Sequence, residues 1–179
     1  IWSLAGIETR IPSPLILKGH AFTVFGAAYS PDGTEIASCS VDSTIRIWSM
    51  PHGETSKPVV LNGHTAWVSA LAYAPNGARL VSVSGDYTVR IWEVPNKNIM
   101  EEPLILRGHT GSINDIAFAP NGRSLASASI DNTVRIWPLP IGETTTGRPG
   151  KKSKEVPPSI LRGHKSSVLA VAYSRSLLF

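Results

Sequence analysis

The chain has 179 residues, of which 42% are hydrophobic, with a mean hydropathy of +0.03 and a formal net charge of +4. This composition is typical of one globular domain. The excess of basic residues is smaller than expected for a dedicated nucleic-acid-binding protein. No apolar run reaches the ~18 residues of a membrane-spanning helix, and a single cysteine, Cys39, excludes a disulfide framework or a cysteine-based zinc site.

The first segment predicts only partial elements. Ile1 and Trp2 resemble the end of a strand, and Pro14–Lys18 predicts a short further strand. Residues 1–22 are therefore interpreted as the end of a preceding unit with its connecting loop. The chain begins without a methionine and ends in "SRSLLF" where a turn sequence would follow, so we expect a fragment of a longer protein.

Three similar units of four strands follow, at residues 23–61, 67–107 and 112–162. In each unit an apolar segment ends in Asp-Gly or Asn-Gly, which is a strong signal for a β-hairpin. A serine-rich second strand, a third strand reading "IRIW" or "VRIW" and a short fourth strand come next. Residues 167–174 then predict one more first strand. Small, β-branched and aromatic residues dominate both faces of the strands, as in sheets covered on both sides.

The third unit carries an insertion at residues 141–158. It is rich in glycine, proline, threonine and lysine, which is typical of a loop without a core of its own. Its lysines, Lys151, Lys152 and Lys154, could attract phosphate or acidic surfaces, and the alternative is a merely solvated loop.

Polar and aromatic residues recur at fixed offsets in the three units. Each aspartate follows a Gly-His histidine by 22 residues, each tryptophan follows that aspartate by six, and each serine precedes it by four. A fourth Gly-His pair lies at 163–164 without such followers. The repeated sets are His20, Ser38, Asp42 and Trp48; His64, Ser82, Asp86 and Trp92; and His109, Ser127, Asp131 and Trp137.

With a period of 44–45 residues, four strands and this signature, the sequence resembles the WD40 repeat family over nearly its whole length. The dipeptide of the name is replaced by Trp-Ser, Trp-Glu and Trp-Pro. The resemblance implies an all-β fold of β-propeller blades, each of four antiparallel strands: three complete blades plus partial terminal strands. It also implies that each repeated set forms a structural hydrogen-bonded tetrad. Propellers usually close with 4–8 blades, so this one is expected to be incomplete.

A serine, a histidine and an aspartate could also form a catalytic triad. A triad needs an exposed serine, an oxyanion hole and a substrate cleft. The same set occurs three times on strands predicted to be packed, and no G-x-S-x-G elbow, metal-spaced histidine cluster or phosphate loop accompanies it. We therefore expect no catalytic residue, no cofactor and no metal site.

The family resemblance implies that partners contact the rim around one end of the propeller. The corresponding positions are the third and fifth residues after each histidine and the residue before each aspartate. Trp67 differs from its counterparts Thr23, Ser112 and Ser167, so it is either a binding hot spot or a packing residue; Phe25 is expected to pack against a neighbouring blade. The candidate positions are Thr23, Phe25, Val41, Trp67, Ser69, Gly85, Ser112, Asn114, Ile130, Ser167 and Leu169.

These features predict a non-catalytic scaffold that presents a rigid rim to a protein or peptide partner, as part of a larger intracellular signalling or assembly protein in the cytoplasm or nucleus. The alternative is binding of nucleic acid or an acidic tail through the lysine-rich insertion. Self-association through open propeller edges is a further possibility, whereas nucleic acid is the less favoured partner and no membrane is expected. Arg46, Arg90 and Arg135 are expected to be structural or solvated residues.

Overall fold

The computed structural model describes residues 14–50, 57–94, 102–139 and 157–174. Within these ranges, twelve strands form three four-stranded antiparallel sheets, each built from consecutive strands. This confirms the predicted all-β fold of three complete four-stranded units. The strands are β1 (Val24–Tyr29), β2 (Glu35–Ser40), β3 (Ile45–Ser49), β4 (Val59–Leu61), β5 (Val68–Tyr73), β6 (Arg79–Ser84), β7 (Val89–Glu93), β8 (Leu104–Leu106), β9 (Ile113–Phe118), β10 (Ser124–Ser129), β11 (Val134–Pro138) and β12 (Ser159–Leu161).

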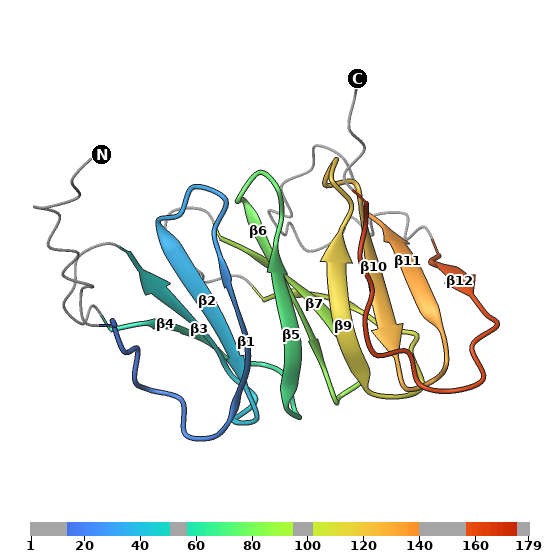
Figure 1. Ribbon diagram of the computed structural model, residues 1–179, viewed down its shortest axis with the longest axis horizontal. Coiled ribbons are helices and arrows are strands. Elements are labelled where there is room, and N and C mark those ends of the chain that lie inside the picture. Colours follow the sequence, from blue (N-terminus) through green and yellow to red (C-terminus); the bar gives the residue numbers. More distant parts are fainter. Residues whose placement is uncertain (1–13, 51–56, 95–101, 140–156, 175–179) are drawn as a thin grey trace, which may run out of the picture.

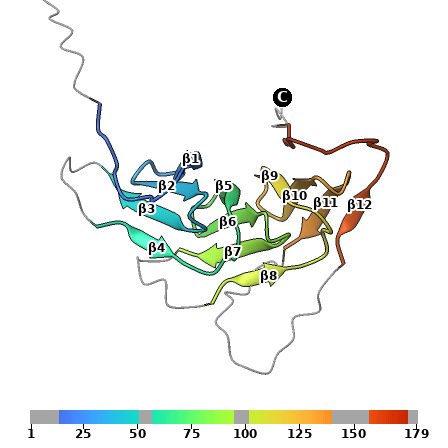
Figure 2. The ribbon, with the colours of Figure 1, turned by 90° about the horizontal axis from the view of Figure 1, so that it is seen from below.

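The three sheets stand side by side as an open fan (Figures 1 and 2). The first strands β1, β5 and β9 are neighbours along one side of the fan, and contacts between β1 and β5 and between β5 and β9 hold the sheets together. The short fourth strands β4 and β8 lie on the opposite side (Figure 2). The sheets therefore have the arrangement of consecutive propeller blades without a closed ring.

Two kinds of turn define two ends of every sheet. The first and second strands are joined by turns in which Gly33, Gly77 and Gly122 have φ of 71°, 72° and 67°. This left-handed conformation suits glycine, which explains the Asp-Gly and Asn-Gly pairs. We call this the hairpin end. The opposite end, at the lower edge of Figure 1, carries the Gly-His loops and the turns between second and third strands; we call it the histidine end.

Apolar side chains fill the spaces between neighbouring sheets. Between the first and second sheets, Cys39, Ile45 and Leu61 pack against Val68 and Leu80. A second cluster joins the second and third sheets, where Val83 and Val89 meet Ile113. Cys39 is fully buried, and burial raises the pKa of its thiol to about 12, so it behaves as a small apolar side chain.

The first sheet differs from the others because one of its faces has no neighbour among the described residues. Val24 is 49% exposed, whereas the equivalent Val68 and Ile113 are fully buried. Tyr29 on the same strand is also exposed. The expectation of sheets covered on both faces is therefore wrong for this sheet, because only a preceding blade could cover the face that carries Val24 and Tyr29.

The predicted strands at Pro14–Lys18 and Ser167–Ser174 do not form. Both segments lack an in-plane neighbour with which to form a ladder within the described chain. Residues 168–173 nevertheless lie against the third sheet, where Val168, Val171 and Tyr173 cover Ala126 and Ala128. This segment occupies the place that β5 takes on the first sheet, as a packed chain without strand partners.

In the part of the chain that the structure describes, no helix is long and apolar enough to cross a membrane.

Candidate functional site

Each sheet contains one line of hydrogen bonds that links the third strand to the turn at the histidine end. In the first sheet, Trp48 Nε1 donates to Ser38 Oγ over 2.9 Å, Ser38 Oγ lies 2.9 Å from His20 Nε2, and His20 Nδ1 lies 2.8 Å from Asp42 Oδ2. Indole nitrogen can only donate and carboxylate can only accept. The donors therefore run in one direction, from tryptophan through serine and histidine to aspartate.

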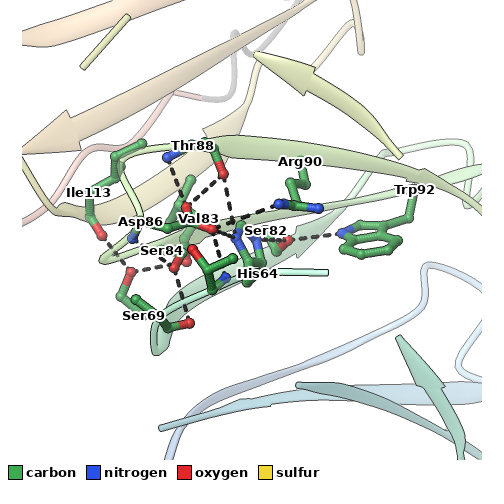
Figure 3. A network of polar contacts seen from close by, with 12 residues as sticks. His64, Ser69, Ser82, Val83, Ser84, Asp86, Thr88, Arg90, Trp92 and Ile113 are labelled. Carbon is green, nitrogen blue, oxygen red and sulfur yellow. Dashed lines mark hydrogen bonds and ion pairs between the residues drawn. The ribbon is translucent and has the colours of Figure 1, made fainter. Parts of the chain in front are cut away.

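The middle sheet repeats this network (Figure 3). Trp92 Nε1 lies 2.9 Å from Ser82 Oγ, which lies 2.8 Å from His64 Nε2, and His64 Nδ1 lies 2.8 Å from Asp86 Oδ2. The carboxylate also accepts bonds from the Thr88 hydroxyl at 2.6 Å and from a backbone N–H of the Gly-His loop. The network thus ties this loop to the turn between β6 and β7.

The third sheet has the same connections. Trp137 Nε1 donates to Ser127 Oγ at 2.8 Å, Ser127 Oγ is 2.7 Å from His109 Nε2, and His109 Nδ1 is 2.7 Å from Asp131 Oδ2. The twelve residues singled out by their spacing in the sequence therefore lie in three hydrogen-bonded sets of four.

The protonation states of these networks follow from burial and hydrogen bonding. Burial lowers the pKa of His64 and of His109 below the usual 6.5 in spite of their carboxylate partners. Burial alone would raise the pKa of Asp86, but hydrogen bonds from His64 and Thr88 outweigh it and hold the pKa well below 3.8. At neutral pH the middle network therefore joins an ionised aspartate to a neutral histidine whose Nδ1 carries the proton.

Serine, histidine and aspartate have the connectivity of a catalytic triad, but the environment of the serine does not suit nucleophilic attack. Ser82 and Ser127 have no exposed surface. The Ser82 oxygen accepts the indole N–H of Trp92 while its own proton points to His64. A substrate carbonyl has no access to this oxygen, and a triad requires such access.

Three arginines pack beneath the Gly-His loops. A Cβ on Gly63 would lie 2.6 Å from Arg90 Nη1, and Gly19 and Gly108 face Arg46 and Arg135 in the same way. Gly63 and Gly108 also have φ near +150°, which disfavours other residues. The Nε atoms of these arginines are buried without a hydrogen-bond partner in the described chain. The backbone conformation therefore favours glycine at positions 63 and 108, and at all three positions a larger residue would displace the end of the arginine side chain.

Trp67 is the most distinctive of the candidate partner-binding residues. Its indole lies over Gly85, where an added Cβ would be only 2.6 Å from the ring, and the side chain is still 44% exposed. In the other sheets the equivalent pairs are Thr23 with Val41 and Ser112 with Ile130. The middle sheet therefore pairs a large residue with glycine, where the other two sheets pair a small polar residue with a larger apolar one.

Two other candidates use their polar atoms between sheets. Ser69 Oγ lies within hydrogen-bond distance of the carbonyl oxygens of Val83 and Ile113 and can donate its proton to either, and Asn114 Nδ2 donates to the carbonyl of Val168 at 2.9 Å. Ser69 in β5, Asn114 in β9 and Phe25 in β1 each lie at a β-bulge, where the residue has no direct partner on the neighbouring strand. A bulge redirects a side chain, here toward the next unit for Ser69 and Asn114, whereas Phe25 is exposed.

The remaining candidates lie at the histidine end. Val41 and Ile130 are exposed there, and their backbone N–H groups donate to the carbonyls of Thr23 and Ser112. Leu169 is also exposed, as is Ser167.

Sequence reasoning missed two aromatic residues at this end. Phe22 and Tyr87 are both exposed, and Tyr87 has a φ of 68°. Its counterparts Ser43 and Asn132 share this left-handed conformation, which asparagine tolerates better than tyrosine. The signal was present in the repeat, because a tyrosine stands where the other units have small polar residues.

Some of the predictions from the sequence concern residues that the structure does not describe. The lysines of the insertion and the Ile1–Trp2 segment lie outside the described ranges. Inside those ranges, no group of three or more His, Cys, Asp or Glu side chains could hold a metal ion.

Comparisons with known proteins agree with this architecture. The family model described as "WD domain, G-beta repeat" matches residues 13–49, 56–93 and 100–138. The solved structure of U3-55K superimposes with a TM-score of 0.69 at 25% identity, over 86% of this chain and 43% of that chain.

Similar curated proteins match over shorter stretches. The Danio rerio Denticleless protein homolog is 42% identical over 60 residues, which is 31% of this chain and 9% of the relative. Human Striatin-4 is 52% identical over 33 residues, 18% of this chain and 4% of the relative. The probable cytosolic iron-sulfur protein assembly protein Ciao1 of Culex quinquefasciatus is 37% identical over 54 residues, 30% and 16% of the two chains. The matches thus span a small part of each relative.

Proposed function

The chain belongs to the WD40 repeat family, and we propose that it is a non-catalytic interaction scaffold that docks a protein or peptide partner at its histidine end. Trp67 on Gly85 is the observation that carries this proposal. Its indole packs against the Gly85 backbone and is still 44% exposed, which suits a binding hot spot.

The surroundings of Trp67 support the same function. Phe22, Val41, Tyr87 and Ile130 are further exposed apolar side chains on the loops and turns of this end. The networks beneath hold these loops to the strands by hydrogen bonds. A surface that is ordered before binding loses less conformational entropy when a partner docks.

A paired substitution tests this proposal while keeping two side chains that already fit together in this fold. Trp67→Thr together with Gly85→Val gives the middle blade the pair that the first blade already has in Thr23 and Val41. Three proteins are used to capture partners from a lysate: wild type, this double variant and a Tyr29→Ala control. The control removes an exposed aromatic residue from the open face of the first sheet.

We expect the double variant to lose the proteins that wild type captures, whereas Tyr29→Ala retains them. Circular dichroism and thermal melting verify that all three chains fold. Equal capture by wild type and the double variant would overturn the proposal.

A further inference from the structure

The loops and turns of the histidine end carry an excess of exposed basic residues. Four exposed basic residues lie at the histidine end: Lys18, Arg107, Arg162 and Lys165. This end comprises the segments 18–23, 41–44, 62–67, 85–88, 107–112, 130–133 and 162–167. The carboxylates in these segments are those of Asp42, Asp86 and Asp131. Among the residues of the hairpin end that the structure describes, four are acidic (Asp32, Glu35, Glu93 and Glu102) and three are basic (Lys57, Arg79 and Arg123).

The three aspartates of the histidine end do not cancel its exposed positive charge. Their side chains are at most 8% exposed and bond to the histidines below. Each blade also places one arginine beneath its Gly-His loop, and Arg90 Nη2 lies 3.9 Å from Asp86. Aspartate and arginine balance formally within each blade, so the four exposed cations determine the sign of the field that a partner meets.

The middle of the same surface is apolar. Trp67 and Tyr87 project from the central blade, with Val41 and Ile130 exposed on the blades at either side. Basic residues around an aromatic centre complement a segment that has an apolar side chain in its middle and carboxylates beside it.

We propose that the partner segment docked at the histidine end is an acidic peptide whose apolar side chain packs on Trp67. This rests on the proposed function and adds the chemistry of the partner to it. The four cations lie on the loops before β1, before β9 and after β12, on both sides of the middle blade that carries Trp67, which suits a few carboxylates on each side of one anchor. Nucleic acid would place a continuous line of phosphates over a largely apolar surface.

Selection from a random peptide library against the full chain tests this chemistry. Selected peptides are synthesised, and their affinities are measured by fluorescence anisotropy at low and high salt. Lys18→Glu with Arg107→Glu reverses two charges at the histidine end. Lys57→Glu with Arg123→Glu reverses one lysine and one arginine at the hairpin end and is the matched control, since all four residues are exposed.

We expect the selected peptides to carry net negative charge and at least one large apolar residue. The histidine-end reversal should weaken them about tenfold and the control about twofold or less, as for exposed charges that steer association. High salt should reduce the difference. The Trp67→Thr/Gly85→Val variant should weaken them by about 30-fold, the loss expected for a hot spot.

The remaining outcomes separate the two proposals. Neutral or basic peptides that still require Trp67 would overturn the acidic partner and leave the docking surface standing. Peptides that bind equally to the Trp67→Thr/Gly85→Val variant, or no enrichment at all, would overturn the docking surface itself. A short single-stranded DNA that binds more tightly than every selected peptide, and does not need Trp67, would favour a nucleic acid instead.

Discussion

Buried histidines give the stability of this protein a defined pH dependence. The pKa values of His64 and His109 lie below 6.5 in the folded chain because their rings are buried. The unfolded chain therefore binds more protons below pH 6.5, and stability decreases as the pH falls. The aspartate pKa values are also lowered, in their case by hydrogen bonds that outweigh burial, so the loss continues below pH 3.8.

Thermal melting between neutral and acidic pH measures this effect. The melting temperature should change little between about pH 7 and 8 and should fall steadily below 6.5. Replacing His64 and His109 by glutamine should lower stability at neutral pH but flatten the part of the curve just below 6.5. A melting temperature that rises on acidification would contradict neutral histidines in the networks.

Tyr87 is a second residue whose environment makes a prediction. A left-handed tyrosine costs of order 1 kcal/mol, and asparagine relieves much of that cost, as at Asn132. Tyr87→Asn should therefore raise the free energy of unfolding by up to about 1 kcal/mol in denaturant titrations and weaken partner binding. Strain that persists at an exposed aromatic residue is consistent with a role in binding. Reduced stability on this substitution would show that Tyr87 is a packing residue.

At the scale of elements, the loop before β5 and the turn after β6 are coupled through Trp67 and Gly85. Gly85→Val alone pushes a branched side chain into the indole and should cost roughly 1–3 kcal/mol. Adding Trp67→Thr removes the clash, so the double variant should be more stable than Gly85→Val alone. A double-mutant cycle in chemical denaturant measures the coupling, and additive effects would contradict the close packing.

The same elements show how far sequence reasoning reaches. Strand positions in the three blades were predictable because the repeat supplies each strand with partners of known spacing. The segments 14–18 and 167–174 have strand-like sequences but no neighbouring strand to bond, and pattern alone does not reveal that. The roles of Ser69 and Asn114 depend on bulges, which redirect side chains by local geometry.

At the scale of the whole molecule, the fan leaves an apolar face open on the first sheet. Val24 and Tyr29 are exposed there, while their counterparts in the second sheet pack on the sheet before. Exposed sheet faces of this kind favour association between copies. The 179-residue chain should therefore show a mass that increases with concentration in light scattering coupled to size exclusion.

Tyr29→Lys should shift that mass toward the monomer, because it places a charge on the open face. Phe22→Lys is the matched control, since it changes an exposed aromatic residue at the histidine end. A wild-type chain that is monomeric at every concentration would mean that the open face is covered in solution.

The separation between buried networks and exposed docking surface has one direct test, a paired measurement of melting temperature and partner capture. Ser82→Ala leaves Trp92 Nε1 and His64 Nε2 without their partner, at roughly 1–3 kcal/mol each. It should therefore lower the melting temperature and leave capture intact below that temperature. Trp67→Thr/Gly85→Val should abolish capture and leave the melting temperature nearly unchanged. If Ser82→Ala instead abolished capture at an unchanged melting temperature, the network would act directly in binding, and the separation between buried networks and docking surface would be wrong.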